Sequence, residues 1–317
     1  MDKADQKAVQ KPVQKSKCSY SIAYRVFTQG IWTILTIFVA IPLLAPIPKI
    51  GLAQSADMSQ IAQAAPPFGG TIFIDPDIIS ESDPTMFQTL SYAGRGVRTM
   101  FDRRVDNWIT VNAYLFNASF IDGLTAEIQV NPEFGSIAAA SAEAQTYAPI
   151  IGRLPTVLRL DLETVWIHKG TYPFGGGNNN LLIHTGQADL YAVDGILEET
   201  LVHEASHTSL DAYHASSAGW LAAQIADGNF ISTYARDFPD REDIAESFLP
   251  YLAVQYRSDR ISQSLYDTIV QTMPNRIAYF NNQSFDLCPI GSTGACVPTE
   301  NRIFSDGFES VNLLNKY

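Results

Sequence analysis

The segment ETLVHEASHTSLDAYH, residues 199–214, contains three of the five histidines of this 317-residue chain. His203 and His207 are four residues apart, and Glu204 directly follows the first. Residues four apart share one face of an α-helix. Apolar residues of an amphipathic helix recur at Ile196, Leu197, Leu201 and Leu210. We therefore predict a helix over 194–211 that presents two imidazoles on one side.

Two imidazoles on one helical face can bind a single metal ion. Glu204 lies about 100° around the helix from His203, beside such an ion rather than on it. That position suits a general base, which takes a proton from a water molecule activated by zinc. The alternative is a buried His–Glu hydrogen-bond cluster on a core helix. Because the pattern rarely arises by chance, we predict one Zn²⁺ ion bound by His203 and His207, with Glu204 as the base.

The other histidines are weaker candidates for a third ligand. The extended motif with three histidines requires Gly and His where this chain has Leu210 and Tyr213, so His214 is one residue late. We interpret His214 as an exposed or supporting residue at the helix end. No spacing connects His168 or His184 to the metal, and we place both on strands.

A carboxylate from a later helix is the stronger candidate, because two His and one Glu form a known catalytic zinc shell. The segment REDIAESF, residues 241–248, has Glu242 and Glu246 on one helical face. One acid can bind the ion while the other accepts a hydrogen bond from a histidine ligand. We assign Glu242 as the ligand and Glu246 as the histidine partner; spacing alone leaves the reverse assignment open. Asp243 points elsewhere, and we interpret it as a capping or solvated charge.

The residues VHEASHTSLD (202–211) and YARDFPDREDIAESF (234–248) resemble the gluzincin metallopeptidases, most closely the branch related to the catalytic domain of anthrax lethal factor. In that branch a Tyr precedes an acidic helix of the form E-x-x-A-E, whose first Glu binds the metal. The resemblance implies that His203, His207 and Glu242 bind zinc. It also implies that Tyr234 donates a hydrogen bond to the oxyanion of the tetrahedral intermediate. The alternative for Tyr234 is a packed aromatic residue before a loop.

The remaining pattern predicts an α+β fold, with strands before the histidine helix and helices after it. We expect strands in 71–79, 108–134 with a hairpin turn at Asp122–Gly123, 164–170 and 181–186, and a loop over 171–180. We expect helices over 83–104, 136–155, the first half of 217–238, 240–259 capped by Asp240, and 262–283 broken at Pro274. A zincin-like domain with a mixed sheet, an active-site helix and a mainly helical C-terminal half would span 71–285.

The N-terminal region has the features of an export signal. Basic residues precede an apolar run over 31–47, and Gly51 and Ala53 provide small residues for cleavage after position 53. Residues 1–53 would then be a signal peptide, followed by a flexible lead-in over 54–70. The alternative is a membrane anchor, although the run is short for a span and contains prolines. We expect a secreted or periplasmic protein that contacts a membrane only through 31–47, if that segment is retained.

Charge and cysteines agree with export. The formal net charge of −12 repels phosphate backbones, which argues against nucleic-acid binding. Cys288 and Cys296 enclose a short loop in the tail over 286–317, and such a pair forms a disulfide outside the cytosol. Two free thiols are the alternative.

These observations predict an exported zinc metalloendopeptidase that acts on a peptide or protein substrate. The acidic surface favours basic or neutral peptides. The alternative is an exported binding or structural protein, in which zinc stabilises the fold without turnover.

Overall fold

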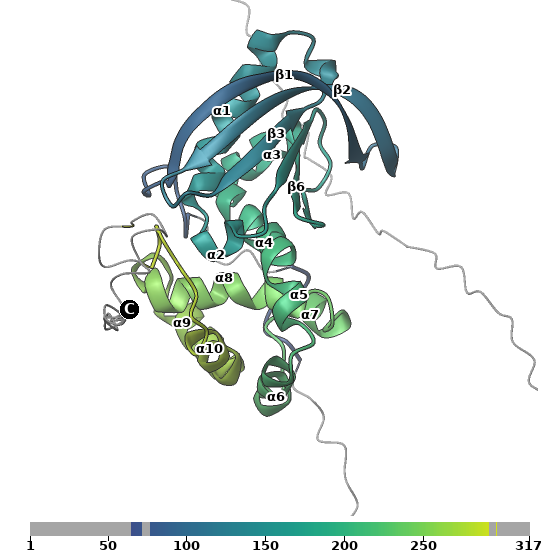
Figure 1. Cartoon of the computed structure of the whole chain (residues 1–317). Helices are drawn as coiled ribbons and strands as arrows, with labels where there is room; N and C mark the ends of the chain where they lie inside the picture. The colour runs from purple at the N-terminus through teal and green to yellow at the C-terminus, as the bar shows by residue number, and fades with distance from the viewer. Residues whose placement is uncertain (1–64, 72–76, 292–295, 297–317) are drawn as a thin grey trace, which may run out of the picture. The chain divides into compact units, whose positions relative to one another are not determined.

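The computed structural model describes residues 65–71, 77–291 and 296. All described residues belong to one compact unit of the chain (Figure 1). The predicted signal peptide, the lead-in up to residue 64, most of the expected strand over 71–79 and the tail beyond 296 lie outside the described residues. Among the described helices, none combines the length and apolar character of a membrane span.

A mixed six-stranded sheet forms the first half of the domain, as the α+β prediction requires. The strand order is β1-β2-β3-β4-β6-β5. β2 (Asn107–Phe120) lies between β1 (Phe87–Asp102) and β3 (Thr125–Val130) and is antiparallel to both. β4 (Thr164–His168) runs parallel to β3 and to β6 (Asn180–His184), whereas β5 (Gly175–Gly177) is antiparallel to β6 at the edge. The predicted hairpin turn is present, and Gly123 adopts the positive φ that this turn requires.

The helix expected over 83–104 is wrong, because most of this segment is the long strand β1. Its backbone pairs with β2 from Phe87 to Asp102, and a register shift occurs at Gly94. Burial alternates along the second half of the strand, which is the period of a half-covered sheet. Pairing with β2 therefore outweighs the weak helical pattern. The expected loop over 171–180 is also corrected in part, because it contains β5.

Helices cover one face of the sheet and form the second half of the domain (Figure 1). The predicted helix over 136–155 is α1 (Ile137–Arg153), and the histidine helix is α4 (Leu197–Ser209). Both pack on the sheet face that carries Ile128 and Ile183. The sequence prediction missed α3 (Thr185–Val193), which begins where β6 ends. The other helices are α2 (Thr156–Arg159), α5 (Asp211–His214), α6 (Ala218–Asp227), α7 (Thr233–Asp237), α8 (Asp243–Tyr256), α9 (Gln263–Thr272) and α10 (Pro274–Asn281), with short 3-10 turns at Pro132–Phe134 and Ser258–Arg260.

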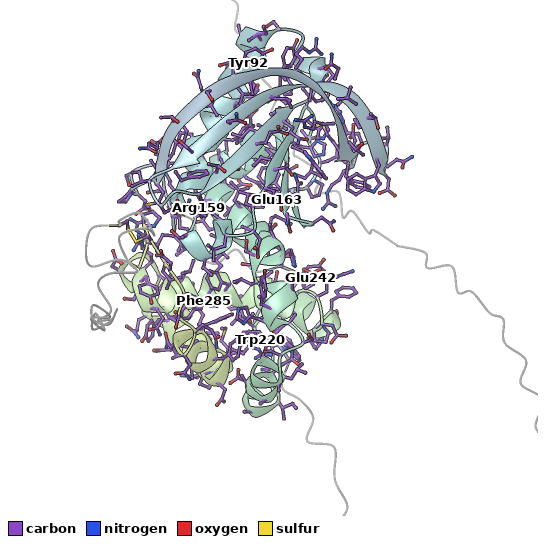
Figure 2. All side chains as sticks on the ribbon, in the orientation of Figure 1. Tyr92, Arg159, Glu163, Trp220, Glu242 and Phe285 are labelled. Carbon is purple, nitrogen blue, oxygen red and sulfur yellow. A yellow bond between two sulfur atoms is a disulfide. The ribbon has the colours of Figure 1, made fainter. Side chains whose placement is uncertain are left out.

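The C-terminal helices enclose a core of aromatic side chains. Trp220, labelled in Figure 2, is fully buried and its ring contacts Phe280, with centroids 5.0 Å apart. The helix expected over 262–283 is broken at Pro274 into α9 and α10, as predicted. Cys288 and Cys296 form the predicted disulfide beside this core, with Cα atoms 5.8 Å apart.

Two details of α8 differ from the prediction. The helix begins at Asp243 with Glu242 as its N-cap, and Asp240 lies in the preceding exposed turn rather than capping the helix. Asp243 is not a solvated charge. It is fully buried, and its Oδ2 accepts a hydrogen bond from Arg276 Nε at 2.9 Å. A buried carboxylate needs such a partner, and Arg276 lies 33 residues later in the sequence, too far for the local pattern to reveal it.

Buried Glu199 on α4 makes the stability of the domain depend on pH. Burial raises the pKa of this carboxyl to about 8, from an ordinary value of 4.5, although its Oε1 accepts a hydrogen bond from the Ile79 amide. The unfolded chain therefore releases this proton at lower pH than the folded protein. The contribution of Glu199 to stability is full below about pH 4.5 and is lost as the pH rises to about 8.

We expect Glu199→Gln to remove this dependence. The stability advantage of the variant over the wild type should grow by about 3 kcal/mol between pH 5 and pH 8. Urea unfolding of both proteins at these two pH values measures the change, with a chelator present so that metal binding adds no pH dependence of its own. An advantage that stays constant with pH would contradict the assignment.

Candidate metal centre

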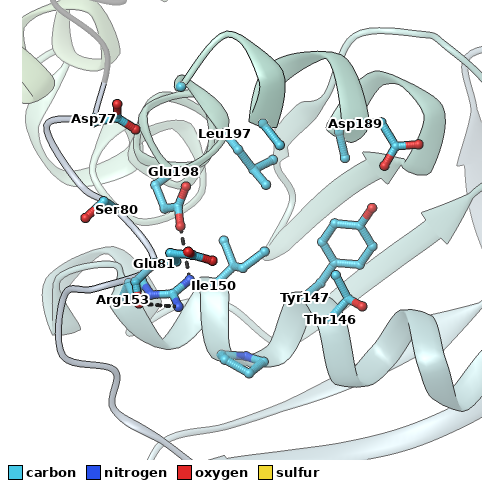
Figure 3. A pocket seen from close by; sticks show the side chains of 14 residues that line it. Asp77, Ser80, Glu81, Thr146, Tyr147, Ile150, Arg153, Asp189, Leu197 and Glu198 are labelled. Carbon is cyan, nitrogen blue, oxygen red and sulfur yellow. Dashed lines mark hydrogen bonds and ion pairs between the residues drawn. The ribbon is translucent and has the colours of Figure 1, made fainter.

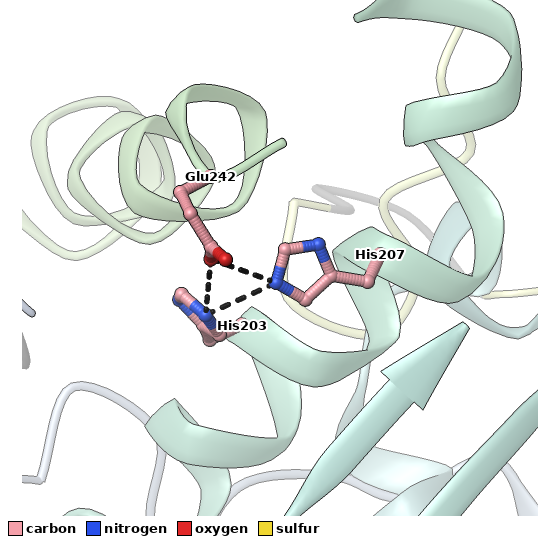
Figure 4. A group of neighbouring side chains, drawn as sticks. All are labelled: His203, His207 and Glu242. Carbon is pink, nitrogen blue, oxygen red and sulfur yellow. Dashed lines mark hydrogen bonds and ion pairs between the residues drawn. The ribbon is translucent and has the colours of Figure 1, made fainter. Parts of the chain in front are cut away.

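Helix α4 and the start of α8 bring together the three predicted ligands. His203 Nε2 and His207 Nε2 lie 3.2 Å apart, and Glu242 Oε2 lies 3.6 Å from the first and 3.2 Å from the second (Figure 4). The spacing of four residues on one helix places the two imidazoles side by side. Two nitrogen atoms and one carboxylate oxygen that converge in this way can hold one metal ion.

Neighbouring side chains hold Glu242 in position. Its Oε1 accepts hydrogen bonds from the Tyr234 hydroxyl and from Arg241 Nε, each at 2.9 Å. Oε2 is thereby left to face the two imidazoles. The side chain is 7% exposed, so water does not compete strongly for these bonds. Tyr234 thus contacts a candidate ligand directly, rather than only packing before a loop.

Each histidine is also supported on the side away from the cluster. His207 Nδ1 donates to Asp211 Oδ2 at 2.7 Å. His203 Nδ1 lies 3.4 Å from Glu246 Oε1, and Ser232 fixes the other oxygen of Glu246 by a hydrogen bond. Such contacts fix the orientation and tautomer of a metal-binding histidine. Glu246 lies where the sequence prediction placed it, as a histidine partner.

The sequence prediction missed the role of Asp211. The residue lies four positions after His207, at the first residue of α5, and this spacing places it on the same side of the chain. The signal was therefore present in the motif itself, one helical turn beyond the second histidine.

The cluster carries the charges of a cation site. Burial lowers the pKa of His207, but hydrogen bonds with Asp211 and Glu242 outweigh this effect and raise it to about 10. Burial also raises the pKa of Glu242, yet the bonds from the two imidazoles hold it well below its ordinary value. An ionised carboxylate therefore faces the histidines, and a metal ion that binds here replaces a proton on His207.

Glu204 lines the same cavity as the three ligands. This cavity, the metal cavity, has a volume of about 320 Å³ and is partly open to solvent. Its wall also includes Tyr234, and the hydroxyl of this residue stays protonated because burial and the nearby Glu242 raise its pKa to about 12. The other lining residues are Arg103, Gly176, Gly177, Asp211 and Arg241. The Glu204 carboxylate, the Tyr234 hydroxyl and the three candidate metal ligands thus line the same solvent-accessible cavity.

Gly176 of the edge strand lies directly against α4 at this point. A Cβ atom on Gly176 would lie 1.8 Å from the carbonyl oxygen of Glu204, which is far inside contact distance. Only glycine permits this approach of strand and helix. The contact fixes β5 at the rim of the metal cavity.

The other histidines lie elsewhere in the fold. His214 Nδ1 is hydrogen-bonded to the Tyr279 hydroxyl at 2.7 Å, and its ring packs against Phe285. His168 and His184 are buried on β4 and β6, where they bond to Asn131 and to the backbone of Lys169. In the part of the chain that the structure describes, His203, His207 and Glu242 are the one group of three such residues close enough to hold a metal ion.

A larger cavity of about 670 Å³ lies between α1 and the turn from α3 to α4 (Figure 3). Its wall includes Tyr147 and Asp189, and an ion pair of Arg153 with Glu198 at 3.0 Å. None of the candidate metal ligands lines it. Size alone therefore does not identify the functional site, and the converging donors favour the smaller cavity.

No protein-family model, curated protein or solved structure matches this chain. The candidate site is thus defined by the motif and by the geometry of its own residues.

Proposed function

We propose that this protein is an exported zinc-dependent metallopeptidase of the gluzincin type, with a zincin-like domain. The observation that carries the proposal is the convergence of His203, His207 and Glu242 beside Glu204 in one open cavity. Imidazole nitrogen and carboxylate oxygen are the donors that zinc takes in catalytic sites, and the Nδ1 atom of each histidine faces a carboxylate.

In the proposed reaction, each residue around the site has a separate role in peptide hydrolysis. A bound zinc ion supplies a Lewis acid, which polarises the scissile carbonyl and makes a water molecule more acidic. Glu204 takes the proton of the attacking water and passes it to the leaving amine. Tyr234 keeps its proton at neutral pH, and we propose that its hydroxyl leaves Glu242 Oε1 to donate a hydrogen bond to the oxyanion as charge develops there. Arg241 and Glu246 keep Glu242 and His203 in place.

A purely structural metal site is the second candidate function, and the geometry favours it less. Structural zinc is normally enclosed by four protein ligands, whereas catalytic zinc keeps one position open. Within the described ranges the cluster offers three ligands, and a cavity of about 320 Å³ opens beside them. We therefore infer turnover rather than a purely structural role.

Reversible removal of the metal tests the proposal. The purified protein should contain about one zinc ion per chain and should cleave an unfolded protein substrate or a peptide library. A chelator should abolish cleavage, and one equivalent of zinc should restore it. Glu242→Ala should lose both zinc and activity, because it removes a ligand. Glu81→Ala changes an exposed acid at the larger cavity and should retain both.

Zinc binding without cleavage of any peptide would favour the structural role. Absence of zinc from the folded protein would refute both candidate functions. N-terminal sequencing of protein recovered outside the cytosol tests export separately, since cleavage after Ala53 leaves Gln54 as the first residue.

A further inference from the structure

The edge strand β5 separates two cavities, because its successive residues face opposite sides of the sheet. The missing side chain of Gly176 faces α4 and the carbonyl of Glu204. The missing side chain of Gly175 faces the other side, where a Cβ atom would lie 2.9 Å from Arg103 Nη2 and 3.5 Å from Leu182 Cβ. Glycine at 175 therefore lets the Arg103 guanidinium lie across the strand.

The second cavity, here the aromatic cavity, lies on the sheet face away from α4. It has a volume of about 260 Å³ and is lined by Phe101, Trp108 and Trp166, with Leu182 at its base. The Trp108 ring meets the rings of Phe101 and Trp166 edge to face, at centroid distances of 5.6 and 5.4 Å. Trp108 is nevertheless 51% exposed. The volume is below that of a typical drug-sized pocket and suits a single large side chain.

Arg103 stands at the junction, because it lines both the metal cavity and the aromatic cavity. It is exposed, and it forms no hydrogen bond or ion pair with the described residues. Its neighbours differ in this respect. Arg104 pairs with Asp102 and Glu133, and Arg241 pairs with Glu242. Arg103 is therefore a cation between the two cavities that is available for an external carboxylate.

We propose that the substrate is a peptide that lies extended along β5, places a large apolar or aromatic side chain in the aromatic cavity and pairs a neighbouring carboxylate with Arg103. The proposal rests on the proposed hydrolytic function. A peptide that adds to a sheet edge turns alternate side chains to opposite faces, so neighbouring residues would face the two cavities that β5 separates. The carboxylate is either an acidic side chain or a free C-terminus next to the apolar residue.

A substrate with a carboxylate beside its apolar side chain differs from the basic or neutral peptides that the net charge favours. The charge of −12 suggests basic or neutral substrates, but it is a property of the whole surface. Recognition depends on the charges at the cavity wall. In the metal cavity, Glu242 contacts Tyr234 and the two histidines, Asp211 contacts His207, and Glu204 is the proposed general base. No acidic residue lines the aromatic cavity, where Arg103 is the one charged side chain among the described lining residues. The exposed cation at the junction thus determines the local preference.

Matched peptides test the proposal with the zinc-loaded protein. One set is blocked at both ends and has Phe or Ala at one position, followed by Glu, Gln or Lys. A further peptide ends in a free carboxylate directly after Phe. We expect kcat/KM to be at least about tenfold higher for Phe–Glu than for Phe–Gln or Ala–Glu. A preference for the free C-terminus over blocked Phe–Glu would identify the terminal carboxylate as the source.

Variants assign these preferences to residues. Arg103→Gln should reduce the Glu-over-Gln preference to within about twofold, and Arg103→Glu should favour Phe–Lys. Trp108→Ala should remove the Phe-over-Ala preference. Its ring is half exposed, so the fold should tolerate the change better than loss of a core aromatic residue. Arg95→Gln, on the exposed part of β1, is the matched control and should leave both preferences unchanged.

Binding to the zinc-loaded Glu204→Gln protein separates this inference from the proposed function. Tighter calorimetric binding of Phe–Glu than of Phe–Gln by about tenfold, without cleavage by the wild type, would support recognition and refute hydrolysis. Equal cleavage and equal binding of all peptides would overturn the inference while hydrolysis stands. A uniform loss of kcat in Arg103→Gln would also overturn it, because the residue would then act on the reaction itself.

Discussion

Replacing Glu204 by Gln should lower the rate of peptide hydrolysis about a thousandfold and leave the zinc content unchanged. Gln has the size and shape of Glu but cannot accept the proton of the attacking water. Glu204 lines the metal cavity but does not belong to the group of three converging ligands, so its loss should not weaken metal binding. Measurement of kcat/KM together with metal analysis of the same preparation tests both expectations.

Glu198→Gln is the matched control for this experiment. Glu198 lies on the same helix but lines the larger cavity, where it pairs with Arg153. The control should keep hydrolytic activity within about twofold, even if it loses some stability. Full activity in Glu204→Gln would rule out the general-base role. Loss of zinc in the same variant would show that Glu204 is needed for metal binding.

Gly176→Ala should have the second large effect, on stability and on activity together. The added methyl group would lie 1.8 Å from the Glu204 carbonyl oxygen, so β5 and α4 must move apart. Overpacking of this kind costs about 1–3 kcal/mol, and a shift of about 1 Å at a reacting group can reduce the rate about a hundredfold. Urea unfolding and zinc-dependent hydrolysis measure the two effects.

Gly69→Ala provides the control for Gly176→Ala. A Cβ atom at Gly69 has no neighbour within 4 Å, and its φ does not lie in the left-handed region. Its stability should therefore stay within about 0.5 kcal/mol of the wild type. If Gly176→Ala were as stable and active as this control, the close contact between β5 and α4 would not be needed for the site.

The local parts of the fold and site could be predicted from the sequence. His203 and His207 lie on a helix as expected, since a spacing of four residues has one simple structural meaning. The turn at Asp122–Gly123 joins β2 to β3 because glycine tolerates its backbone angles. Metal chemistry restricted the third donor to a few residue types and left Glu242 and Glu246 as alternatives, and the family resemblance implied Glu242, which lies beside the histidines.

The sequence predictions were wrong, or made no statement, where distant parts of the chain interact. The segment Phe87–Asp102 has a weak helical pattern and becomes a strand through pairing with β2. Asp243 looks like an exposed acid in a helical first turn, but Arg276 pairs with it in the core. The contact of Gly176 with the Glu204 backbone likewise joins segments whose sequences show no sign of it. A periodic pattern reports the local environment, not the partner that a side chain meets.

The edge strand β5 consists of three glycines, Gly175–Gly177. Gly175 and Gly176 present only backbone on either side of β5, so this strand can align a substrate but cannot discriminate among side chains. Under the proposed binding mode, discrimination belongs to Arg103 and Trp108, at the tip of the β1–β2 hairpin. That hairpin contributes none of the three converging ligands. Under this proposal, substrate preference and metal binding depend on separate segments of the chain. Substitutions in the hairpin should therefore change the substrate preference without changing the three metal ligands.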